Sequence, residues 1–415
     1  MKVVIATAVY YPQINGVAVF SHNLACGLAK RGLEVMVLCP SQTGKSYTRT
    51  IDGVKTVYLR SVEAKVYPDQ IHDVPEKKKF LGLKWPRLIY KNGFRVSVFP
   101  QLEVKRALDE FEPDVVHVQV SDPIGLSVVS YARKKGIPVV TTEHNQPEVL
   151  TEPLHIPGFV RKPTNYLLSA YFRNRQSKSD FVTMPTEMAI SNLIKNGTEF
   201  PVPVAAISNG VDLSNFKPGK PAVAVFEKYG LNKNYKTVLN LGRLDPEKKV
   251  GILIEAFLKV EQELKDAQLV IVGDGVDKNH LMKMAEGHSN IHFLGRIVPP
   301  ELYQVYRLGD VFATASEIET QGIVLIEAAA CGMPLIAVDK GAVAEVCQDG
   351  KNGYLCNPGA VNEIAAAMVK ILSDDKMRTG FSKKSLEIAR GHDFERTLDR
   401  FINIYQKVIS SKEAK

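Results

Sequence analysis

Residues 316–337 read S-E-I-E-T-Q-G-I-V-L-I-E-A-A-A-C-G-M-P-L-I-A and carry the strongest structural signal in the chain. A polar, turn-forming opening runs into an Ala-rich apolar segment. That segment ends at Gly332 and Pro334, because glycine suits the position after a helix and proline cannot continue one. Short apolar runs lie on either side, at 309–314 and 335–338. Strand, helix and strand in this order predict a βαβ unit of a parallel sheet.

Two carboxylates in this stretch, Glu319 and Glu327, are separated by seven residues. A helix that begins within Thr320, Gln321 and Gly322 presents free amides and the positive end of its dipole, which suit a phosphate. Glu319 then lies beside the helix start, and Glu327 reaches a hydroxyl-bearing group on the other side. A ligand with a central diphosphate and a sugar at each end has this layout. The alternative is a Glu319 that only caps the helix dipole and a solvated Glu327.

The motif resembles the nucleotide-sugar motif of the retaining GT-B glycosyltransferases of the glycogen synthase and phosphatidylinositol mannosyltransferase kind (glycosyltransferase family 4, group 1). The resemblance implies that Glu327 holds the ribose hydroxyls of the donor and Glu319 the hydroxyls of the transferred sugar. The run E-T-Q-G is most similar to the diacylglycerol glucosyltransferases of that family. The implied fold is α/β, with two Rossmann-like domains facing a cleft and a C-terminal helix crossing back to the first domain.

The length of 415 residues suits two domains. Pro, Gly, Asn and Ser cluster at 201–221 and mark the crossing between them. We therefore expect an N-terminal domain at 1–205, a nucleotide-sugar-binding domain at 206–391, and a last segment, 392–415, that returns to the first domain.

Five cysteines without a C-x-x-C pair favour reduced thiols in the cytosol, and argue against a disulfide framework or a zinc site. No apolar run reaches about 18 residues, so no membrane span is expected. The start at Met1 passes directly into a Tyr-Tyr-Pro turn, which predicts a first strand in place of a signal peptide. No Asp-x-Asp follows a strand, so neither a metal nor any cofactor beyond the nucleotide-sugar donor is expected.

The net charge of +8 is uneven along the chain. Residues 1–200 hold 26 basic and 18 acidic side chains and so carry the whole excess. A basic face favours an anionic partner such as an acidic lipid, a polyphosphate or a nucleic acid.

Residues 77–102 contain no acidic side chain and mix basic with aromatic residues. This composition suits a segment at a membrane interface. Stacking on single-stranded nucleic acid uses the same composition, and a solvated, partly core-packed connection is a third possibility. The residues expected to meet a membrane or acceptor are Lys77, Lys78, Lys79, Lys84, Trp85, Arg87, Tyr90 and Lys91.

The first 40 residues read as strand, Gly-containing turn, helix and strand, which is a Rossmann-type start. The family's loop there is usually Gly-Gly with amides near the donor phosphates, and Asn15 replaces the first glycine. The resemblance therefore gives this role to Gly16 alone. His144 follows the strand at 137–142, where ligands of open α/β sheets gather. It resembles the family's histidine near the 6-hydroxyl of the transferred sugar.

In the second half, an apolar strand ends at Gly242-Arg243, and Lys248 follows five residues later. An arginine fork and a lysine point charge can hold one phosphate group between them. In the family this pair binds the donor diphosphate and stabilises it as it leaves. Lys248 matches best, with Lys249 at the place of the usual glycine. Ile297, in a run resembling the family's V-x-F-L-G-x-V, is expected to border the base.

These expectations describe a retaining transfer of a hexose, with glucose and a UDP-sugar favoured, to a membrane lipid acceptor such as diacylglycerol. Its place of action would be the cytosolic face of a membrane, to which it binds peripherally. A soluble transferase acting on a saccharide or small molecule, and a GDP-mannose-dependent lipid mannosyltransferase, are alternatives. Two further alternatives are a nucleotide- or nucleic-acid-binding protein without transferase activity, and a nucleotide-sugar epimerase. No nucleic-acid partner is expected. The oligomeric state stays open.

Overall fold

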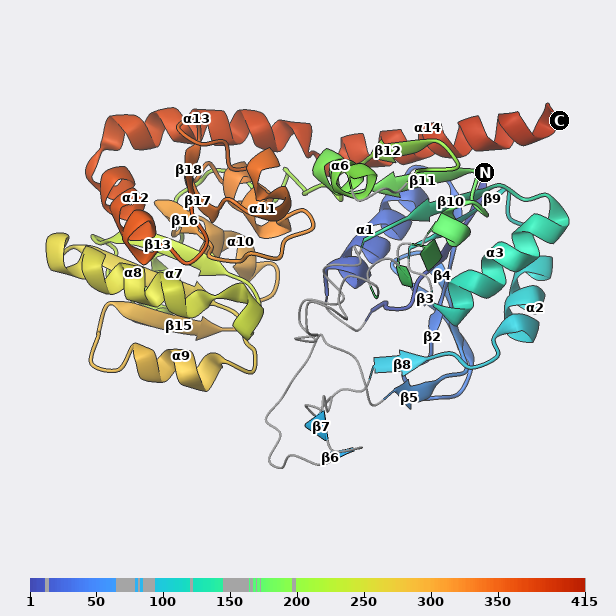
Figure 1. Cartoon of the computed structure of the whole chain (residues 1–415), viewed down its shortest axis with the longest axis horizontal. Helices are drawn as coiled ribbons and strands as arrows, with labels where there is room; N and C mark the ends of the chain where they lie inside the picture. The colour runs from blue at the N-terminus through green and yellow to red at the C-terminus, as the bar shows by residue number, and fades with distance from the viewer. Residues whose placement is uncertain are drawn as a thin grey trace. The chain divides into compact units, whose positions relative to one another are not determined.

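The computed structural model describes residues 1–11, 15–64, 79–80, 83–84, 94–119, 122–144, 164, 167–168, 170–171, 173–195 and 199–414. The chain divides into two compact units (Figure 1). The first unit comprises Met1–Ser208 and Thr397–Lys415, and the second comprises Asn209–Arg396. Each unit is built around its own mostly parallel sheet, as the α/β expectation requires.

The first unit contains an eight-stranded sheet in the order β12-β11-β10-β9-β1-β2-β4-β3, antiparallel only between β3 and β4. Its strands are β1 (Lys2–Ala6), β2 (Glu34–Pro40), β3 (Tyr47–Ile51), β4 (Val54–Leu59), β9 (Val115–Val118), β10 (Val139–Thr142), β11 (Phe181–Met184) and β12 (Val204–Ala206). Two short antiparallel pairs are β5 (Val62–Ala64) with β8 (Phe94–Val96), and β6 (Lys79–Phe80) with β7 (Leu83–Lys84).

Helices cover both faces of this sheet, because alternate strand residues point to opposite sides. Val4 and Ala6 of β1 pack under α2 and α3, with Val104 and Leu108. The helices described in this unit are α1 (Gly16–Lys30), α2 (Gln101–Phe111), α3 (Pro123–Lys135), α6 (Glu187–Lys195) and the greater part of α14 (Phe394–Glu413).

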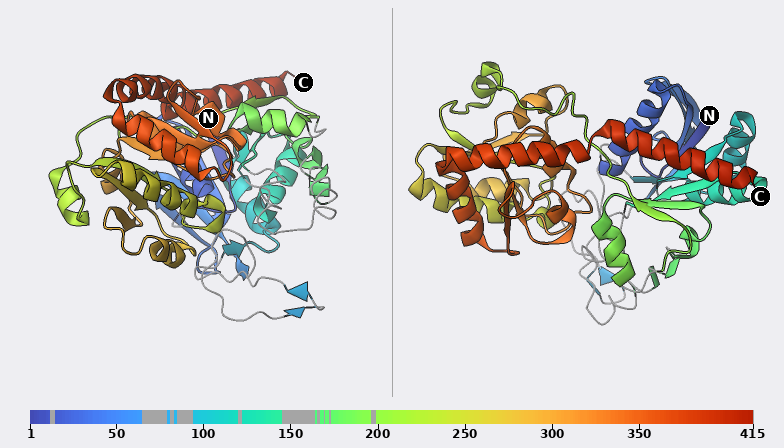
Figure 2. Two further views of the ribbon diagram at one scale, coloured as in Figure 1. Left: turned by 60° about the vertical axis from the view of Figure 1, so that its left-hand side comes forward. Right: turned by 90° about the horizontal axis from the view of Figure 1, so that it is seen from above.

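The C-terminal helix α14 packs on the first unit, as the resemblance implied (Figure 2). Its buried Tyr405 hydroxyl is 2.7 Å from His117 Nδ1 in β9, and its Phe401 ring lies 6.0 Å from that of Phe20 in α1. Near its end, Lys412 pairs with Asp180 at 3.1 Å. The helix is therefore anchored along its length by apolar, hydrogen-bonded and ionic contacts.

The second unit has a six-stranded, wholly parallel sheet in the order β15-β14-β13-β16-β17-β18. Its strands are β13 (Lys236–Leu241), β14 (Ala267–Val272), β15 (Ile291–Gly295), β16 (Val311–Ala313), β17 (Leu335–Val338) and β18 (Gly353–Cys356). Its helices are α7 (Val223–Tyr229), α8 (Val250–Glu263), α9 (Lys278–Met284), α10 (Glu301–Tyr306), α11 (Ile323–Ala330), α12 (Val361–Ser373) and α13 (Asp375–Gly391).

Neighbouring residues along the strands of this sheet point to opposite faces, so the sheet separates two apolar cores. Val238 of β13 belongs to the cluster with α8, α9 and α12, and its neighbour Leu239 belongs to the cluster with α7, α10 and α11. Leu269 and Val270 of β14 divide in the same way. Both faces of the sheet are thus covered, which is the rule for parallel sheets and explains their nearly continuous apolar strands.

The βαβ unit expected around 316–337 is present as β16, α11 and β17. The helix begins at Ile323, however, one residue after the expected range, because Gly322 has the left-handed φ of 73° and caps the helix from outside. At the other end Gly332 has a φ of 82°, the conformation that glycine adopts without a steric penalty. Among the described residues, no helix is both long and apolar enough to cross a bilayer.

Candidate active site

Both sheets reverse their strand order at one point. In the second unit the chain runs outward from β13 to β15 and then returns to β16 on the other side of β13. In the first unit the same reversal falls between β1 and β9. Crevices at the carboxyl ends of strands at such switch points are the usual ligand sites of open α/β sheets. The loops after β13 and β16 contain Arg243, Lys248 and Glu319, so three predicted residues meet at this edge.

The centre of this edge is an ion pair between Lys248 and Glu319. Lys248 Nζ donates to Glu319 Oε1 at 2.7 Å, and the two side chains are 21% and 16% exposed. The next residue, Lys249, is exposed and adopts a left-handed φ of 52°. This is the backbone conformation that a glycine adopts most easily, which explains the family's glycine at this position. The geometry thus favours Lys248, not Lys249, as the ligand-facing lysine.

Arg243 is held by two acids of its own loop. Its guanidinium pairs with Asp245, and Nη2 donates to Glu247 Oε1 at 2.7 Å. Asp245 is buried and accepts a hydrogen bond from the Val276 amide at 3.2 Å. Burial raises the pKa of Asp245, and the Arg243 charge opposes that shift. The guanidinium is therefore oriented before any ligand arrives.

Close contact with the next loop shapes this turn. A Cβ at Gly273 would lie 1.8 Å from the Gly242 carbonyl oxygen, and one at Gly275 would lie 2.3 Å from that of Leu244. Only glycine permits such an approach between two backbones. The Gly-Asp-Gly sequence after β14 therefore supports the arginine-bearing loop from behind.

The start of α11 lies directly after Glu319 in the chain. The N-cap residue is Gly322, which has no side chain to cap the first turn. The first amides of a helix lack intrahelical partners and attract anions. The Gln321 side chain is 2% exposed and accepts from the Asn209 amide at 3.2 Å, so it holds the loop. The Glu319 carbonyl is fixed in turn by the Ala342 amide at 3.3 Å.

Glu327 projects from α11 into a largely apolar setting. The half-buried carboxylate accepts a hydrogen bond from the Tyr306 hydroxyl of α10. Burial raises the pKa of Glu327 to about 7, and the Tyr306 hydrogen bond lowers it. Glu327 is therefore not the merely solvated residue of the alternative interpretation. Ile297 is partly buried and packs against the apolar cluster that contains Tyr306.

In the first unit, His144 lies at the end of β10 within a buried hydrogen-bonded network. His144 Nε2 is 2.8 Å from Gln119 Oε1, and the amide of Gln119 contacts His117. His117 also approaches Thr142 Oγ1 at 2.7 Å. Burial lowers the pKa of His144 to about 4, so its ring is neutral at pH 7. With Nε2–H donated to Gln119, Nδ1 is left as an acceptor.

Gly16 is the first residue of α1, after the N-cap Asn15, whose Oδ1 accepts from the Ala18 amide at 2.9 Å. A Cβ placed on Gly16 would meet no atom within 4 Å. Space is therefore open above this helix start. Asn15, at the place of the family's first glycine, has an extended conformation that needs no glycine.

Three ionisable residues of the first unit that the sequence did not point to carry buried polar atoms, and one of them, Glu143, directly precedes His144. Glu143 Oε1, Asp122 Oδ2 and the Nε and Nη1 atoms of Arg175 have no hydrogen-bond partner within the described part of the chain. Burial raises the pKa of Asp122 to about 6 and also raises that of Glu143, while the Arg175 charge lowers both. Asp122 and Arg175 are distant from both Glu143 and His144 in the sequence, so no motif pointed to them.

The expected membrane segment falls mainly outside the described residues. Lys79 and Lys84 lie on β6 and β7, where only the backbone is described. The other residues of that prediction, Lys77, Lys78, Trp85, Arg87, Tyr90 and Lys91, lie outside the described residues.

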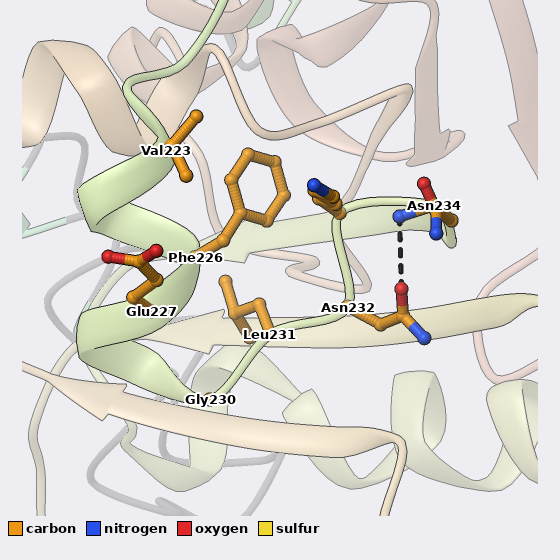
Figure 3. Close-up of a pocket in the computed structure, with 8 residues that line it drawn as sticks. Val223, Phe226, Glu227, Gly230, Leu231, Asn232 and Asn234 are labelled. Atoms are coloured by element: carbon orange, nitrogen blue, oxygen red, sulfur yellow. Dashed lines mark hydrogen bonds between the residues drawn. The ribbon is translucent and has the colours of Figure 1, made fainter.

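A shallow pocket of the second unit lies far from the site in the fold. It is lined by residues 223–234, between α7 and the start of β13 (Figure 3). The loop before β13 is at the amino end of the parallel sheet, whereas Arg243 and Glu319 follow carboxyl ends. The pocket therefore has no part in the site described above.

Two family models match the chain and together cover most of it. Residues 224–387 match the glycosyl transferases group 1, and residues 14–215 match Glycosyltransferase Family 4. The first match contains Arg243, Lys248, Glu319 and Glu327, and the second contains Gly16 and His144.

Two curated relatives are similar over nearly the full length of both chains. An alpha-monoglucosyldiacylglycerol synthase of Acholeplasma laidlawii is 26% identical and aligns over 93% of this chain and 92% of its own length. One of Streptococcus pneumoniae is 27% identical, over 100% of this chain and 89% of its own.

Solved structures match the fold at lower identity. Sucrose-phosphate synthase of Thermosynechococcus elongatus superposes with a TM-score of 0.73 at 17% identity, covering 99% of both chains. The HepE structure of Anabaena gives 0.69 at 18% identity, over 98% of this chain and 100% of that one. The fold is therefore GT-B, and the chain belongs to the group 1, family 4 glycosyltransferases that take their sugar from a nucleotide-sugar donor.

Proposed function

We propose that this protein transfers glucose from UDP-glucose, with retention at the anomeric carbon, to a membrane lipid such as diacylglycerol. The observation that carries the proposal is the Lys248–Glu319 pair, in which Glu319 lies in the loop that leads to the start of α11, with Arg243 after the neighbouring strand β13. The two cations and the helix amides offer one anionic group a complete set of donors. We call Arg243, Lys248, Glu319 and the start of α11 the donor site.

The donor diphosphate is proposed to enter by exchange of partners. Arg243 is neutralised by Asp245 and Glu247, and Lys248 by Glu319. A diphosphate that takes over these two cations frees Glu319 to accept hydroxyls of the sugar. The chemistry is then leaving-group stabilisation by charges placed in advance, which contribute most where charge develops in the transition state.

Retention is proposed to follow a front-face path, in which the leaving diphosphate and the entering hydroxyl share one side of the sugar. Once the diphosphate has taken over Lys248, Glu319 serves the sugar hydroxyls, and no pair of carboxylates placed for a double displacement is evident among the described residues. Neutral His144, with Nδ1 as acceptor, suits the 6-hydroxyl of the sugar. No metal is required in this scheme, because Arg243 and Lys248 supply the countercharge of the diphosphate.

Glu327 is proposed to accept hydrogen bonds from the ribose hydroxyls of the donor. These hydroxyls bind the ionised carboxylate best. With a pKa of about 7, a large share of Glu327 is ionised at neutral pH. The Tyr306 hydroxyl holds one carboxylate oxygen and leaves the other for the ligand.

A lipid acceptor is supported by the two relatives, whose names give diacylglycerol glycolipids as their products. The net charge is a second support, because the excess of +8 lies entirely within residues 1–200. Such a domain is attracted to anionic lipid headgroups. Peripheral binding at the cytosolic face of a membrane is part of the proposal.

The second candidate is mannosyl transfer from GDP-mannose. It is favoured by a phosphatidyl-myo-inositol mannosyltransferase of Mycobacterium leprae, which is 34% identical over 49% of this chain and 54% of its own length. The run E-T-Q-G at 319–322 favours glucose instead, by its likeness to the diacylglycerol glucosyltransferases.

The test is transfer by the purified full chain in vesicles that contain diacylglycerol and an anionic phospholipid. UDP-glucose is expected to give a lipid-linked α-glucoside, identified by the coupling constant of its anomeric proton. GDP-mannose and a water-soluble saccharide acceptor are the comparison arms. A β-product would overturn retention, transfer only to the saccharide would overturn the lipid acceptor, and GDP-mannose as the better donor would establish the second candidate.

Two binding measurements accompany the turnover assay. A panel of nucleotide sugars is expected to show the largest protection against thermal unfolding with UDP-glucose, since a ligand of the native state raises its stability. Co-sedimentation with anionic vesicles is expected at low ionic strength and is lost in high salt. Added Mg²⁺ or Mn²⁺ is expected to leave turnover unchanged, and strict dependence on either would contradict the metal-free scheme.

A further inference from the structure

Three side chains with metal-binding atoms meet on one side of α1 in the first unit. His22 and Cys26 are one helical turn apart, and Asp52 comes from the turn between β3 and β4. His22 Nε2 is 3.2 Å from Asp52 Oδ2 and 3.7 Å from Cys26 Sγ. One donor atom of each residue lies within 4.8 Å of the other two.

These separations are those of ligands around a tetrahedral zinc ion. Zinc binds nitrogen and oxygen at about 2.0–2.1 Å and thiolate sulfur at about 2.3 Å. A tetrahedral angle then sets nitrogen and oxygen about 3.4 Å apart, and nitrogen and sulfur about 3.6 Å apart. The Nε2–Oδ2 and Nε2–Sγ distances are close to these values. Cys26 Sγ is also 3.8 Å from His22 Nδ1, so the imidazole ring must turn about its own side-chain bonds for Nε2 to meet an ion shared with the thiolate.

The second nitrogen of His22 has the partner expected of a metal-bound histidine. His22 Nδ1 lies 3.1 Å from the hydroxyl of Tyr10, a residue at the end of β1 that is 1% exposed. A hydrogen bond at the far nitrogen fixes the tautomer and the ring orientation of a ligating histidine. It leaves Nε2 as the nitrogen available to a metal ion, 3.2 Å from Asp52 Oδ2.

Accessibility suits an ion that enters from solvent. The Asp52 side chain is 70% exposed and that of His22 is 22% exposed, whereas Cys26 is buried. An exposed His–Asp pair alone contributes little to stability, which is the simpler interpretation of this contact. On that interpretation the Cys26 thiol is a small side chain of the apolar core.

We propose that His22, Cys26 and Asp52 bind one zinc ion, with water in the fourth position, and that the ion ties α1 to the β3–β4 hairpin. One nitrogen, one sulfur and one oxygen ligand in tetrahedral geometry favour Zn²⁺ over Mg²⁺ or Ca²⁺, which prefer oxygen ligands. Binding replaces the thiol proton of Cys26, which leaves to solvent. The cysteine spacing gave no sign of this, because the ligands come from a helix and a distant turn.

The test uses the purified full chain, stripped of metal and titrated with Co²⁺ as a spectroscopic substitute for zinc. We expect about one equivalent to bind, with a thiolate-to-cobalt charge-transfer band and the intense visible bands of tetrahedral cobalt. Zn²⁺ added afterwards is expected to remove both. Absence of these bands in the folded wild-type chain would overturn the proposal.

Variants distinguish the site from adventitious binding. Cys26→Ser is expected to lose the charge-transfer band, and Asp52→Asn, at an exposed position where folding is not at risk, to weaken zinc affinity. Tyr10→Phe is expected to weaken it about 10–100-fold. Cys331→Ser, which removes a partly buried thiol elsewhere, is the matched control and retains the bands. Bands that persist in Cys26→Ser or disappear in Cys331→Ser would contradict the assignment.

Discussion

The donor site of the second unit and the histidine network of the first hold their polar side chains by different means. In the donor site, Arg243 and Lys248 are charged, partly exposed, and paired with acids. In the network, His144 and His117 are buried and neutral, with pKa values lowered to about 4 and about 3 by burial. Both lie at switch points of parallel sheets.

The difference shows two ways to prepare a site for a sugar nucleotide. Paired charges in partial contact with water can exchange partners at little cost in free energy, so an incoming diphosphate can replace Glu319 or Glu247. Buried neutral groups cannot exchange partners without leaving a polar atom unsatisfied, so they keep one arrangement. We infer that the charged pairs of the second unit can rearrange around an anionic ligand, while the network of the first unit keeps one arrangement.

The largest effect is expected from breaking the charged pair. Lys248→Ala removes a countercharge of the leaving diphosphate and is expected to lower kcat about 10²–10³-fold. The measurement is steady-state transfer from UDP-glucose to vesicle-bound diacylglycerol. Lys228→Ala breaks an ion pair with Glu301 on the surface of the same unit and serves as the control. Equal kcat values for the two variants would remove Lys248 from the chemistry.

Glu327→Gln is expected to weaken donor binding and to stabilise the fold. Loss of charge-assisted bonds to the ribose lowers affinity for UDP-glucose about 10–100-fold, measured by calorimetry. The pKa of Glu327 is about 7 when folded and 4.5 in its ordinary range, so ionisation opposes folding as pH rises from 4.5 to 7. The variant is therefore expected to be more stable by about 1–3 kcal/mol at pH 8.

The stability gain of Glu327→Gln must fade in acid, because wild-type Glu327 is protonated there in both states. Thermal unfolding at pH 8 and at about pH 3.5, which lies below the unfolded pKa of 4.5, separates the two conditions. A gain that is equal at both would show that packing, and not the buried charge, is responsible.

A smaller effect is expected from the neutral network. Gln119→Leu removes the partner that orients His144 and is expected to lower kcat about 3–10-fold, the value of one hydrogen bond. The donor KM is expected to change little, since the cations of the donor site are untouched. A rise in KM at constant kcat would instead assign Gln119 to substrate binding.

The smallest effect on activity is expected at Lys249. Its φ of 52° is unfavourable for a side chain, so Lys249→Gly is expected to stabilise the fold by about 1 kcal/mol. Turnover is expected to stay at the wild-type value, in contrast to Lys248→Ala. Loss of activity in Lys249→Gly would return the phosphate-binding role to Lys249.

Several features followed from local sequence because they depend on neighbours in the chain. The βαβ unit around 316–337 was predicted from its apolar periodicity and its Gly-x-Pro end, and it is present. The helix was predicted to begin within 320–322 but begins at Ile323, because the residue type alone does not show that Gly322 adopts a left-handed conformation. The parallel sheets and the return of α14 were implied by the family resemblance and are also present.

The sequence by itself determined the fold, the family and the residues that we propose for the donor site, because motifs such as Gly242-Arg243 and 319–327 are contiguous. Tertiary structure alone decided which partners these residues have. The Lys248–Glu319 pair joins loops 71 positions apart, and His117 meets Tyr405 across 288 positions. Burial and long-range proximity set the charge states of Glu327 and His144, since desolvation depends on what the whole fold packs around a group.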